Sequence, residues 1–327
     1  MTPAVSPTRR ALACAPFAAI AAALLPGPAL AQPWPSRPIR LVLPFTPGGS
    51  ADVVARAIAA GLGERLAQPV TIDYRPGASG NVAMESVARA APDGYTLLLA
   101  TTGAATNPSL MRMSFDPLKD LAPVAQLTRV YLAVFARPDL PAASPRELVR
   151  LMRARTGGMS CASYGGTSQF ACELLPILAG VPVVQVAYKG PGPAMSDVAG
   201  GTVDLLVDTP ASAAPMVQAG RIRPIGTLSP TARSSPAGDL APMASALPGF
   251  EMAGWHGLFA PAGTPPEIVE RVNHAVNETL SEPALRRRMI DLDLDPAGGG
   301  ADAFAQTMRR DTARFQRIAR DAGLKPQ

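Results

Sequence analysis

Histidine and cysteine are scarce in this chain of 327 residues. The two histidines are His256 and His274, and no HExxH, CxxC, GxSxG or GxxxxGK[ST] motif occurs. Metalloprotease, redox, nucleophile-elbow and nucleotide-phosphate signatures are therefore all missing. His274 falls on the polar face of a predicted helix, and His256 follows Trp255 in a predicted strand, where we interpret it as structural. We predict no metal, no cofactor, no catalytic residue and no enzymatic activity.

Aromatic residues and excess charge are also limited. Aromatics make up 5% of the chain, and the formal net charge is +5. Two of the basic residues, Arg9 and Arg10, lie in an N-terminal leader without acidic residues, which leaves 28 basic and 25 acidic residues in the rest. No basic stripe interleaved with aromatics is present, so we expect no nucleic-acid partner.

The leader has the pattern of a secretory signal peptide. An apolar stretch from Ala11 to Leu25 follows Arg9 and Arg10, and the small-x-small sequence at 29–31 predicts cleavage after Ala31. General secretory and twin-arginine export both remain open. No other segment has the roughly 18 apolar residues of a membrane span. We therefore expect an exported, periplasmic protein whose residues 1–31 are removed.

Two cysteines, Cys161 and Cys172, remain after the leader. An oxidising compartment permits a disulfide between them. Two small buried thiols are an equally good interpretation, since cysteine often packs as a small apolar residue.

The stretch 39–56, IRLVLPFTPGGSADVVAR, organises the mature chain. A short apolar run predicts a buried strand, Pro44 and Pro47 end its pairing, and Gly48 and Gly49 permit a tight turn. We expect Ser50 to cap the helix that follows. The free N–H groups of a helix N-terminus attract anions, so this turn is a candidate anion site.

Two α/β units are expected. The first unit has predicted strands at 39–43, 70–74 and 95–100 with helices at 50–66 and about 80–90. This βαβαβ order implies a parallel sheet, whose ligands bind beyond the C-terminal ends of the strands. The second unit has predicted strands at 130–135, 159–163, 183–187, 203–207 and 222–228, with similar glycine- and hydroxyl-bearing loops.

The C-terminal region supplies a strand at 255–260 and helices at 264–281, 283–291 and 301–322, after a predicted loop at 229–250. Having no sheet of their own, these helices are expected to pack on the first unit. The chain then crosses between two lobes twice. We predict lobe 1 from residues 32–126 plus 252–327 and lobe 2 from residues 127–251, joined by a hinge that closes on a ligand.

Four segments in this order resemble a known family. They are PFTPGGSADVVAR, YRPGASGNVAMESVARAAPDGYTLLLAT, YKGPGPAMSDVAGGTVDLL and WHGLFAPAGTPPEIVERVNHAV. The chain resembles the Bug-type extracytoplasmic solute receptors, the substrate-binding proteins of tripartite tricarboxylate transporters, over most of residues 34–322. This resemblance implies a two-lobed α/β periplasmic-binding-protein fold of the Venus flytrap kind, type II, with two chain crossings.

The resemblance also implies a site and a function. Family members bind small carboxylates largely through backbone amides and waters from the strand-end loops of both lobes. Carried over to this sequence, the ligand-binding residues are Phe45, Gly48, Gly49, Ser50, Asp52, Gly77, Ala78, Ser79, Asn81, Gly165, Gly166, Thr167, Ser168, Lys189 and Asp208. Gln169 and Phe170 stand where the family often has a His-Leu pair.

We therefore expect a monomeric periplasmic solute-binding protein that captures an organic acid. Its partners are the small carboxylate ligand and the membrane permease subunits of a tripartite tricarboxylate-type transporter. An alternative is a periplasmic ligand sensor that docks on a membrane signalling protein without transport. A more remote alternative is an enzyme of unknown type. The sequence leaves the identity of the acid open, because backbone amides accept any well-placed carboxylate.

Overall fold

The computed structural model describes residues 1–2, 4 and 34–326. The helices and strands named below lie in the compact unit Pro35–Gln327. Apart from residues 1–2 and 4, the predicted signal peptide lies outside the described residues, and so does its cleavage site. None of the described helices is long and apolar enough to cross a membrane.

The first lobe is built on a six-stranded sheet of order β13-β4-β12-β3-β1-β2. Its strands are β1 (Ile39–Leu43), β2 (Val70–Tyr74), β3 (Thr96–Thr101), β4 (Leu121–Tyr131), β12 (Ala253–Pro261) and β13 (Leu294–Pro296). Strands β2, β1 and β3 are parallel, as predicted, whereas β12 is antiparallel to both β3 and β4. Its helices are α1 (Ser50–Leu66), η2 (Ala78–Gly80), α2 (Asn81–Ala88), α3 (Gly103–Leu110), α4 (Pro117–Asp120), α9 (Pro266–Ser281), α10 (Pro283–Asp291) and α11 (Ala301–Asp321).

The second lobe is built on a five-stranded sheet of order β7-β6-β8-β5-β9. Its strands are β5 (Ala133–Ala136), β6 (Met159–Ser163), β7 (Val183–Ala187), β8 (Leu205–Asp208) and β9 (Arg223–Thr227). Its helices are α5 (Pro145–Ala154), α6 (Gly166–Ala179), α7 (Pro191–Ala199), α8 (Pro210–Gln218) and η3 (Met243–Ser245). The segment predicted as loop at 229–250 instead contains η3 and the hairpin of β10 (Arg233–Ser235) and β11 (Gly238–Leu240).

Local sequence explains the elements that position the site. The apolar run Leu41–Leu43 is fully buried in β1, and the strand ends before Pro44. In α1, Val54, Ile58 and Leu62 recur every four residues and are all completely buried, which is the apolar stripe of a helix packed on a core. The turn between β1 and α1 is thereby held at the C-terminal edge of the sheet.

The chain changes sheets at Leu132. A continuous strand is predicted at 130–135, but β4 stays in the first sheet to Tyr131 and β5 enters the second sheet at Ala133. An unbroken apolar run carries no sign of where a chain leaves one sheet for another. We propose that the lobes divide at Leu132 and again just before Ala253, where β12 returns to the first sheet.

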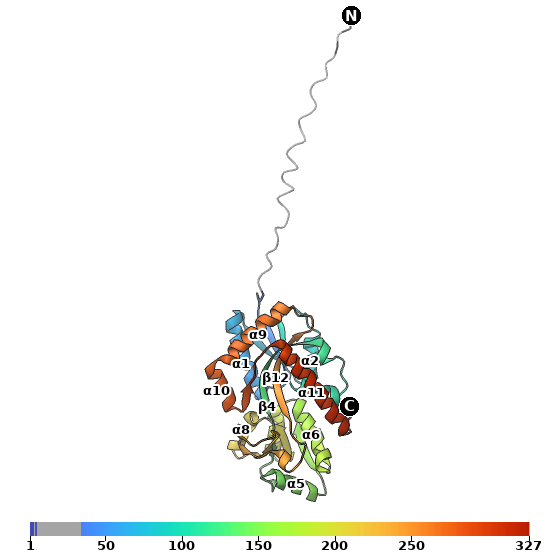
Figure 1. Cartoon of the computed structure of the whole chain (residues 1–327), viewed down its shortest axis with the longest axis vertical. Coiled ribbons are helices and arrows are strands. Elements are labelled where there is room, and N and C mark those ends of the chain that lie inside the picture. The colour runs from blue at the N-terminus through green and yellow to red at the C-terminus, as the bar shows by residue number, and fades with distance from the viewer. Residues whose placement is uncertain (3, 5–33, 327) are drawn as a thin grey trace. The chain divides into compact units, whose positions relative to one another are not determined.

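Two long neighbouring strands connect the lobes. β12 pairs with β4 from Pro261↔Leu121 to Ala253↔Tyr131. In Figure 1 these two strands run between the part carrying α1, α2 and α9 and the part carrying α5, α6 and α8. The two crossings therefore lie next to each other at one end of a hydrogen-bonded ribbon.

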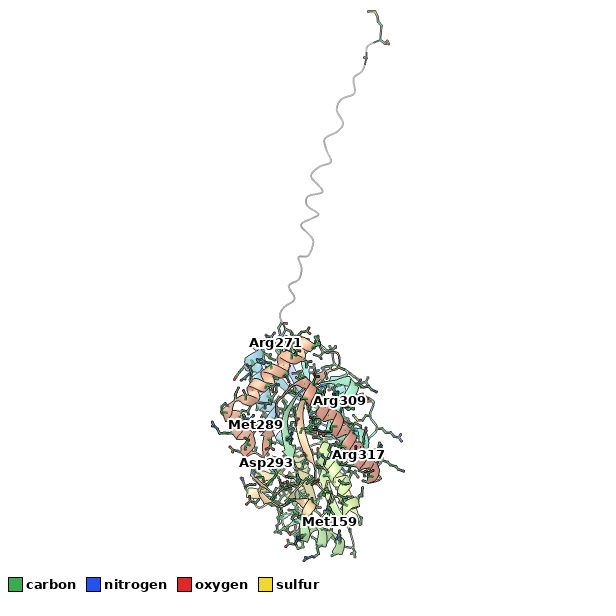
Figure 2. The ribbon with its side chains drawn as sticks, viewed as in Figure 1. Met159, Arg271, Met289, Asp293, Arg309 and Arg317 are labelled. Atoms are coloured by element: carbon green, nitrogen blue, oxygen red, sulfur yellow. A yellow bond between two sulfur atoms is a disulfide. The ribbon has the colours of Figure 1, made fainter. Side chains whose placement is uncertain are left out.

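The C-terminal elements also join the two lobes. The predicted helices at 283–291 and 301–322 correspond to α10 and α11, but β13 between them adds a strand to the first sheet. Phe315 of α11 packs edge-on against Phe170 of α6, with ring centroids 5.0 Å apart. Asp293, which Figure 2 shows close to Met289 of α10, accepts a hydrogen bond of 2.9 Å from Nε of Arg233 in the β10–β11 hairpin.

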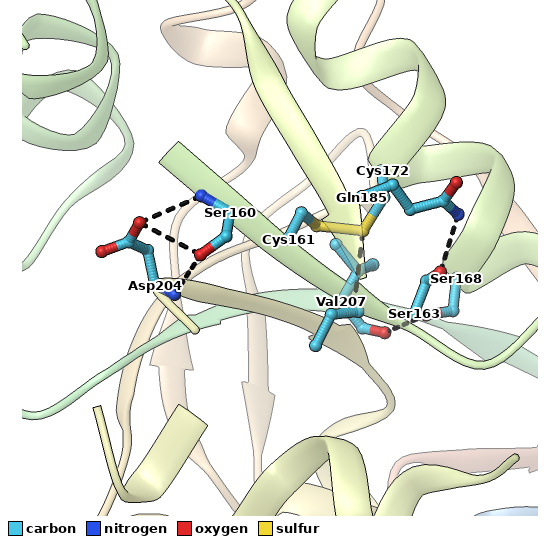
Figure 3. The surroundings of a disulfide bond; sticks show 9 residues. Ser160, Cys161, Ser163, Ser168, Cys172, Gln185, Asp204 and Val207 are labelled. Atoms are coloured by element: carbon cyan, nitrogen blue, oxygen red, sulfur yellow. Dashed lines mark hydrogen bonds between the residues drawn. A yellow bond between two sulfur atoms is a disulfide. The ribbon is translucent and has the colours of Figure 1, made fainter. Parts of the chain in front are cut away.

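A disulfide joins Cys161 of β6 to Cys172 of α6. Figure 3 shows it beside two polar contacts of the second lobe, between Ser160 and Asp204 and between Ser168 and the carbonyl of Val207. Of the two interpretations left open by the sequence, the structure has the bridge. The bonded pair encloses the turn at residues 164–166, which contributes to the cavity described next.

Candidate functional site

A cavity of about 50 Å³ lies where the two lobes and the β4–β12 ribbon meet. One buried water needs about 10–15 Å³ on a comparable measure, so this space has room for a few waters or for a single carboxylate group. Its walls are formed by Phe45, Gly49, Ser50, Ala51, Thr101, Thr102, Val130, Leu132, Tyr164, Gly165, Thr167, Ser168, Thr209, Trp255 and His256.

The β1–α1 turn forms the first-lobe wall. Gly49 precedes the helix, and the first backbone bonds run from Asp52 N and Val53 N to the Gly49 carbonyl. Within the described part of the chain, the N–H groups of Ser50 and Ala51 therefore have no backbone partner. Ser50 is the first helical residue and its side chain is not a cap, contrary to our expectation; its hydroxyl lies 3.4 Å from Nε2 of His256.

The β6–α6 turn forms the opposite wall. Gly165 and Gly166 have φ values of +107° and +58°, which favour glycine over residues with a side chain. The first backbone bond of α6 runs from Gln169 N to the Gly165 carbonyl. The N–H groups of Gly166, Thr167 and Ser168 are left without a backbone partner among the described residues. Two helix N-termini with unpaired donors thus converge on one cavity.

The β4–β12 ribbon closes the third side. Trp255 and His256 of β12 are 3% and 2% exposed, and Val130 and Leu132 line the same cavity. Nδ1 of His256 lies 2.7 Å from the Thr128 hydroxyl of β4. Burial lowers the pKa of His256 to about 4, so its imidazole is neutral at pH 7.

The two lobes touch around the cavity. The rings of Phe45 and Tyr164 pack edge-on with centroids 5.5 Å apart. The Ser79 hydroxyl of the first lobe donates a hydrogen bond of 2.6 Å to Oε1 of Gln169 in the second lobe. Gly165 also faces the backbone of Ser79, where a Cβ atom would meet Ser79 Cα at 2.7 Å. The arrangement is therefore a closed one, in which glycines permit close approach of the lobes.

Arginine and lysine are missing from the residues that line the cavity within the described chain. Asp208 is completely buried but does not line the cavity. Burial raises its pKa to about 6, although the Tyr164 hydroxyl and the backbone N–H of Thr209 both donate hydrogen bonds to its carboxylate. Burial, with the neighbouring Asp208 carboxylate, raises the pKa of Tyr164 well above its usual value. An anion in this cavity would have to be held by uncharged donors.

The structure brings only part of the predicted site to the cavity. The predicted residues that line it are Phe45, Gly49, Ser50, Gly165, Thr167 and Ser168. The predicted residues that do not line it are Gly48, Asp52, Gly77, Ala78, Ser79, Asn81, Gly166, Lys189 and Asp208. The hydroxyl of Ser168 donates to the Val207 carbonyl, so it is already engaged.

The predicted residues outside the cavity have other partners. The carboxylate of Asp52 accepts hydrogen bonds from Gly48 N, Arg56 and Tyr74, and it stabilises the turn from behind. Burial opposes ionisation of Asp52, but these bonds lower its pKa. The Asn81 side-chain oxygen accepts a hydrogen bond from the Asn107 amide. Lys189 is exposed to solvent. A turn motif predicts where a loop lies, but not which side chains point inward.

Several lining residues are missed by the sequence prediction. Thr101, Thr102 and Thr209 follow strands whose polar ends are visible in the sequence, so the strand-end rule contains a signal for them. Trp255, His256 and Val130 reach the cavity because β12 and β4 pair side by side across a long sequence separation, and Leu132 follows β4 directly. No local pattern predicts that pairing.

Comparison with known proteins identifies the family. Residues 54–324 match the model of the tripartite tricarboxylate transporter family receptor, TctC. The chain belongs to this receptor family. The protein BugT of Bordetella pertussis is 32% identical over 311 residues, which cover 94% of this chain and 95% of BugT. The resemblance noted in the sequence is thereby confirmed.

Solved structures agree with this receptor fold. The periplasmic binding protein BugD has a TM-score of 0.85 and 30% identity, covering 90% of this chain and all of the BugD chain. R. palustris Rpa4515 with adipate has a TM-score of 0.85 and 34% identity, with coverages of 90% and 100%. MatC from Rhodopseudomonas palustris with bound malate has a TM-score of 0.82 and 32% identity, with coverages of 88% and 100%. The family and fold are those of substrate-binding proteins, in two α/β lobes.

Proposed function

We propose that this receptor captures a small carboxylate between its lobes in the periplasm and delivers it to the membrane permease subunits of a tripartite tricarboxylate-type transporter. The observation that carries this proposal is the convergence of two helix N-termini, at Ser50 and Gly166, on one cavity. Unpaired N–H groups and the positive ends of helix dipoles favour negatively charged oxygens.

The cavity chemistry supports an acid as the ligand. Hydroxyl groups and a neutral imidazole accompany the backbone donors, while Phe45, Trp255 and Leu132 supply apolar contact for a short carbon skeleton. Uncharged, oriented dipoles can stabilise a carboxylate without a cationic side chain. The adipate and malate bound to the two R. palustris proteins are carboxylates of this kind.

Delivery and location are extensions of the same proposal. The family takes its name from a tripartite transporter, which supports membrane permease subunits as partners. A signal-peptide sequence at residues 1–31 supports export to the periplasm. We expect the receptor to act as a monomer, to need no cofactor, and to release its ligand chemically unchanged.

A thermal-shift screen tests the proposal. Malate, adipate and other small organic acids are compared with their amides, which keep the shape but lose the negative charge. A bound acid stabilises the fold by RT ln(1 + [L]/Kd), about 2.7 kcal/mol at a hundredfold excess over Kd. At least one acid should raise Tm while its amide does not. Equal shifts with acid and amide, or no shift with any acid, would contradict carboxylate capture.

A further inference from the structure

His256 is held in one orientation by the strands around it. It lies on β12, between β3 and β4, and only 2% of its surface is exposed. Nδ1 lies 2.7 Å from the hydroxyl of Thr128, and Nε2 lies 3.4 Å from the hydroxyl of Ser50. One ring nitrogen is thus anchored in the sheet, and the other faces the cavity that Ser50 and His256 both line.

The Thr128 contact fixes the tautomer. Thr128 is completely buried, and Nδ1 of His256 is the partner of its hydroxyl in the described chain. A buried hydroxyl that donates to nothing is unfavourable, so Thr128 donates and the neutral ring accepts at Nδ1. The proton of the imidazole then sits on Nε2. The cavity side of His256 is therefore an N–H donor.

The neighbour of this Nε2–H donor, the Ser50 hydroxyl, makes only a long contact with it. A separation of 3.4 Å between Nε2 and the Ser50 hydroxyl is long for a hydrogen bond, whose usual range is about 2.7–3.2 Å. The backbone N–H groups of Ser50 and Ala51 have no backbone partner within the described residues. Together these groups form a cluster of uncharged donors that lacks an acceptor of matching strength.

We propose that His256 is a ligand-contacting residue that sets specificity, and that its Nε2–H donates a hydrogen bond to a carboxylate oxygen held at the N-terminus of α1. This inference rests on the proposed function and assigns a residue to it. A ligand without an acceptor oxygen at this point would leave a buried donor unpaired, and sites of this type discriminate strongly against such analogues. This role would come in addition to the structural one expected from the sequence.

The scarcity of histidine makes a direct test practical. The full chain labelled with ¹⁵N-histidine has signals from His256 and His274 alone. His274 is exposed on α9, where it pairs with Glu278, and it serves as an internal reference. In the free protein, the ring ¹⁵N shifts of His256 should show an unprotonated Nδ1 and a protonated Nε2. Malate or adipate, whichever raises Tm, should shift the Nε2–H signal and leave His274 unchanged.

Matched variants complete the test by calorimetry with the same acid. His256→Phe removes the donor and should raise Kd at least tenfold. His256→Gln keeps an N–H donor near the Nε2 position and should bind more tightly than His256→Phe. Thr128→Val, which removes the hydroxyl that fixes the ring, should raise Kd less than His256→Phe. His274→Gln should leave Kd unchanged.

Each outcome decides the inference. If the wild-type protein binds an acid while the His256 signals stay unmoved, the inference is overturned and carboxylate capture stands. The same holds if folded His256→Phe binds within twofold of wild type. If no acid binds the wild-type protein, the proposed function fails and the assignment of His256 fails with it. The NMR arm needs no variant, so a misfolded mutant cannot obscure the answer.

Discussion

Replacing Gly49 by alanine should weaken ligand binding by obstructing closure of the lobes. Gly49 has φ −88° and ψ 174°, which any residue can adopt, so alanine fits the first lobe itself. A Cβ atom at this position would lie 2.8 Å from Cγ of Pro191 on the second lobe. Carbon atoms in good contact lie about 3.5–4.0 Å apart, so the lobes would have to separate at this point.

The size of the effect follows from the cost of overpacking. An extra methyl group in a tightly packed position costs about 1–3 kcal/mol. The clash exists only where the lobes meet, so this cost is borne by the closed, ligand-bound state. A coupling of about 1–3 kcal/mol corresponds to a 5–150-fold rise in Kd. The free protein can relieve the clash by opening, so its Tm should change less than the Tm of the complex.

Calorimetry with malate or adipate measures the effect, and a second variant tests its cause. Pro191→Ala removes the clashing Cγ, so the Gly49→Ala/Pro191→Ala double variant should recover most of the lost affinity. Gly157→Ala is a suitable control, because its Cβ would meet nothing within 4 Å. Gly61 is not a suitable control, because its Cβ would lie 2.3 Å from Thr279 of α9. Wild-type affinity in Gly49→Ala, or no recovery in the double variant, would refute the closure argument.

Two further predictions concern stability. The Cys161–Cys172 bridge closes a short loop with a sequence separation of 11. From the lost chain entropy of such a loop, the Cys161→Ala/Cys172→Ala variant should have a free energy of unfolding about 3 kcal/mol lower than wild type. An unchanged urea-unfolding curve would contradict this. Burial lowers the pKa of His256 in the folded state to about 4, below its ordinary 6.5. The unfolded chain therefore binds a proton more readily than the folded one. The contribution of neutral His256 to the free energy of unfolding is fully present above pH 6.5 and is lost as the pH falls towards 4. Relative to His256→Gln, wild type should lose about 3 kcal/mol between pH 7 and pH 4; parallel urea-unfolding profiles of the two proteins would rule out a buried neutral imidazole.

The glycine turns could be predicted from sequence because their cause is local. A strand, a pair of glycines and a helix start put Gly49 and Gly165 at the ends of parallel strands, and parallel strands place those ends at one edge. The inward or outward direction of side chains depends on distant partners. The Asp52 side chain accepts hydrogen bonds from Tyr74 and Arg56 and does not line the cavity, whereas Ser50 does.

The third wall could not be predicted in this way. His256 lines the cavity because β12 lies between β3 and β4, with partners more than a hundred residues away in sequence. The change of sheet at Leu132 is equally hidden, since the residues on both sides favour strands. Long-range pairing therefore decides both where the chain changes sheets and which side chains form the third wall of the cavity, and neither has a local signature.

The ribbon of β4 and β12 leads to both chain crossings and also forms one wall of the cavity. Val130 and Trp255 belong to the paired strands, Leu132 follows β4 directly, and all three line the cavity. A bend in the ribbon therefore reshapes the ligand's surroundings directly, and a substitution that alters affinity there also alters the mechanics of the connection. Trp255 is one of two tryptophans in the chain, so its fluorescence would test, without an attached dye, whether the lobes move when a ligand binds.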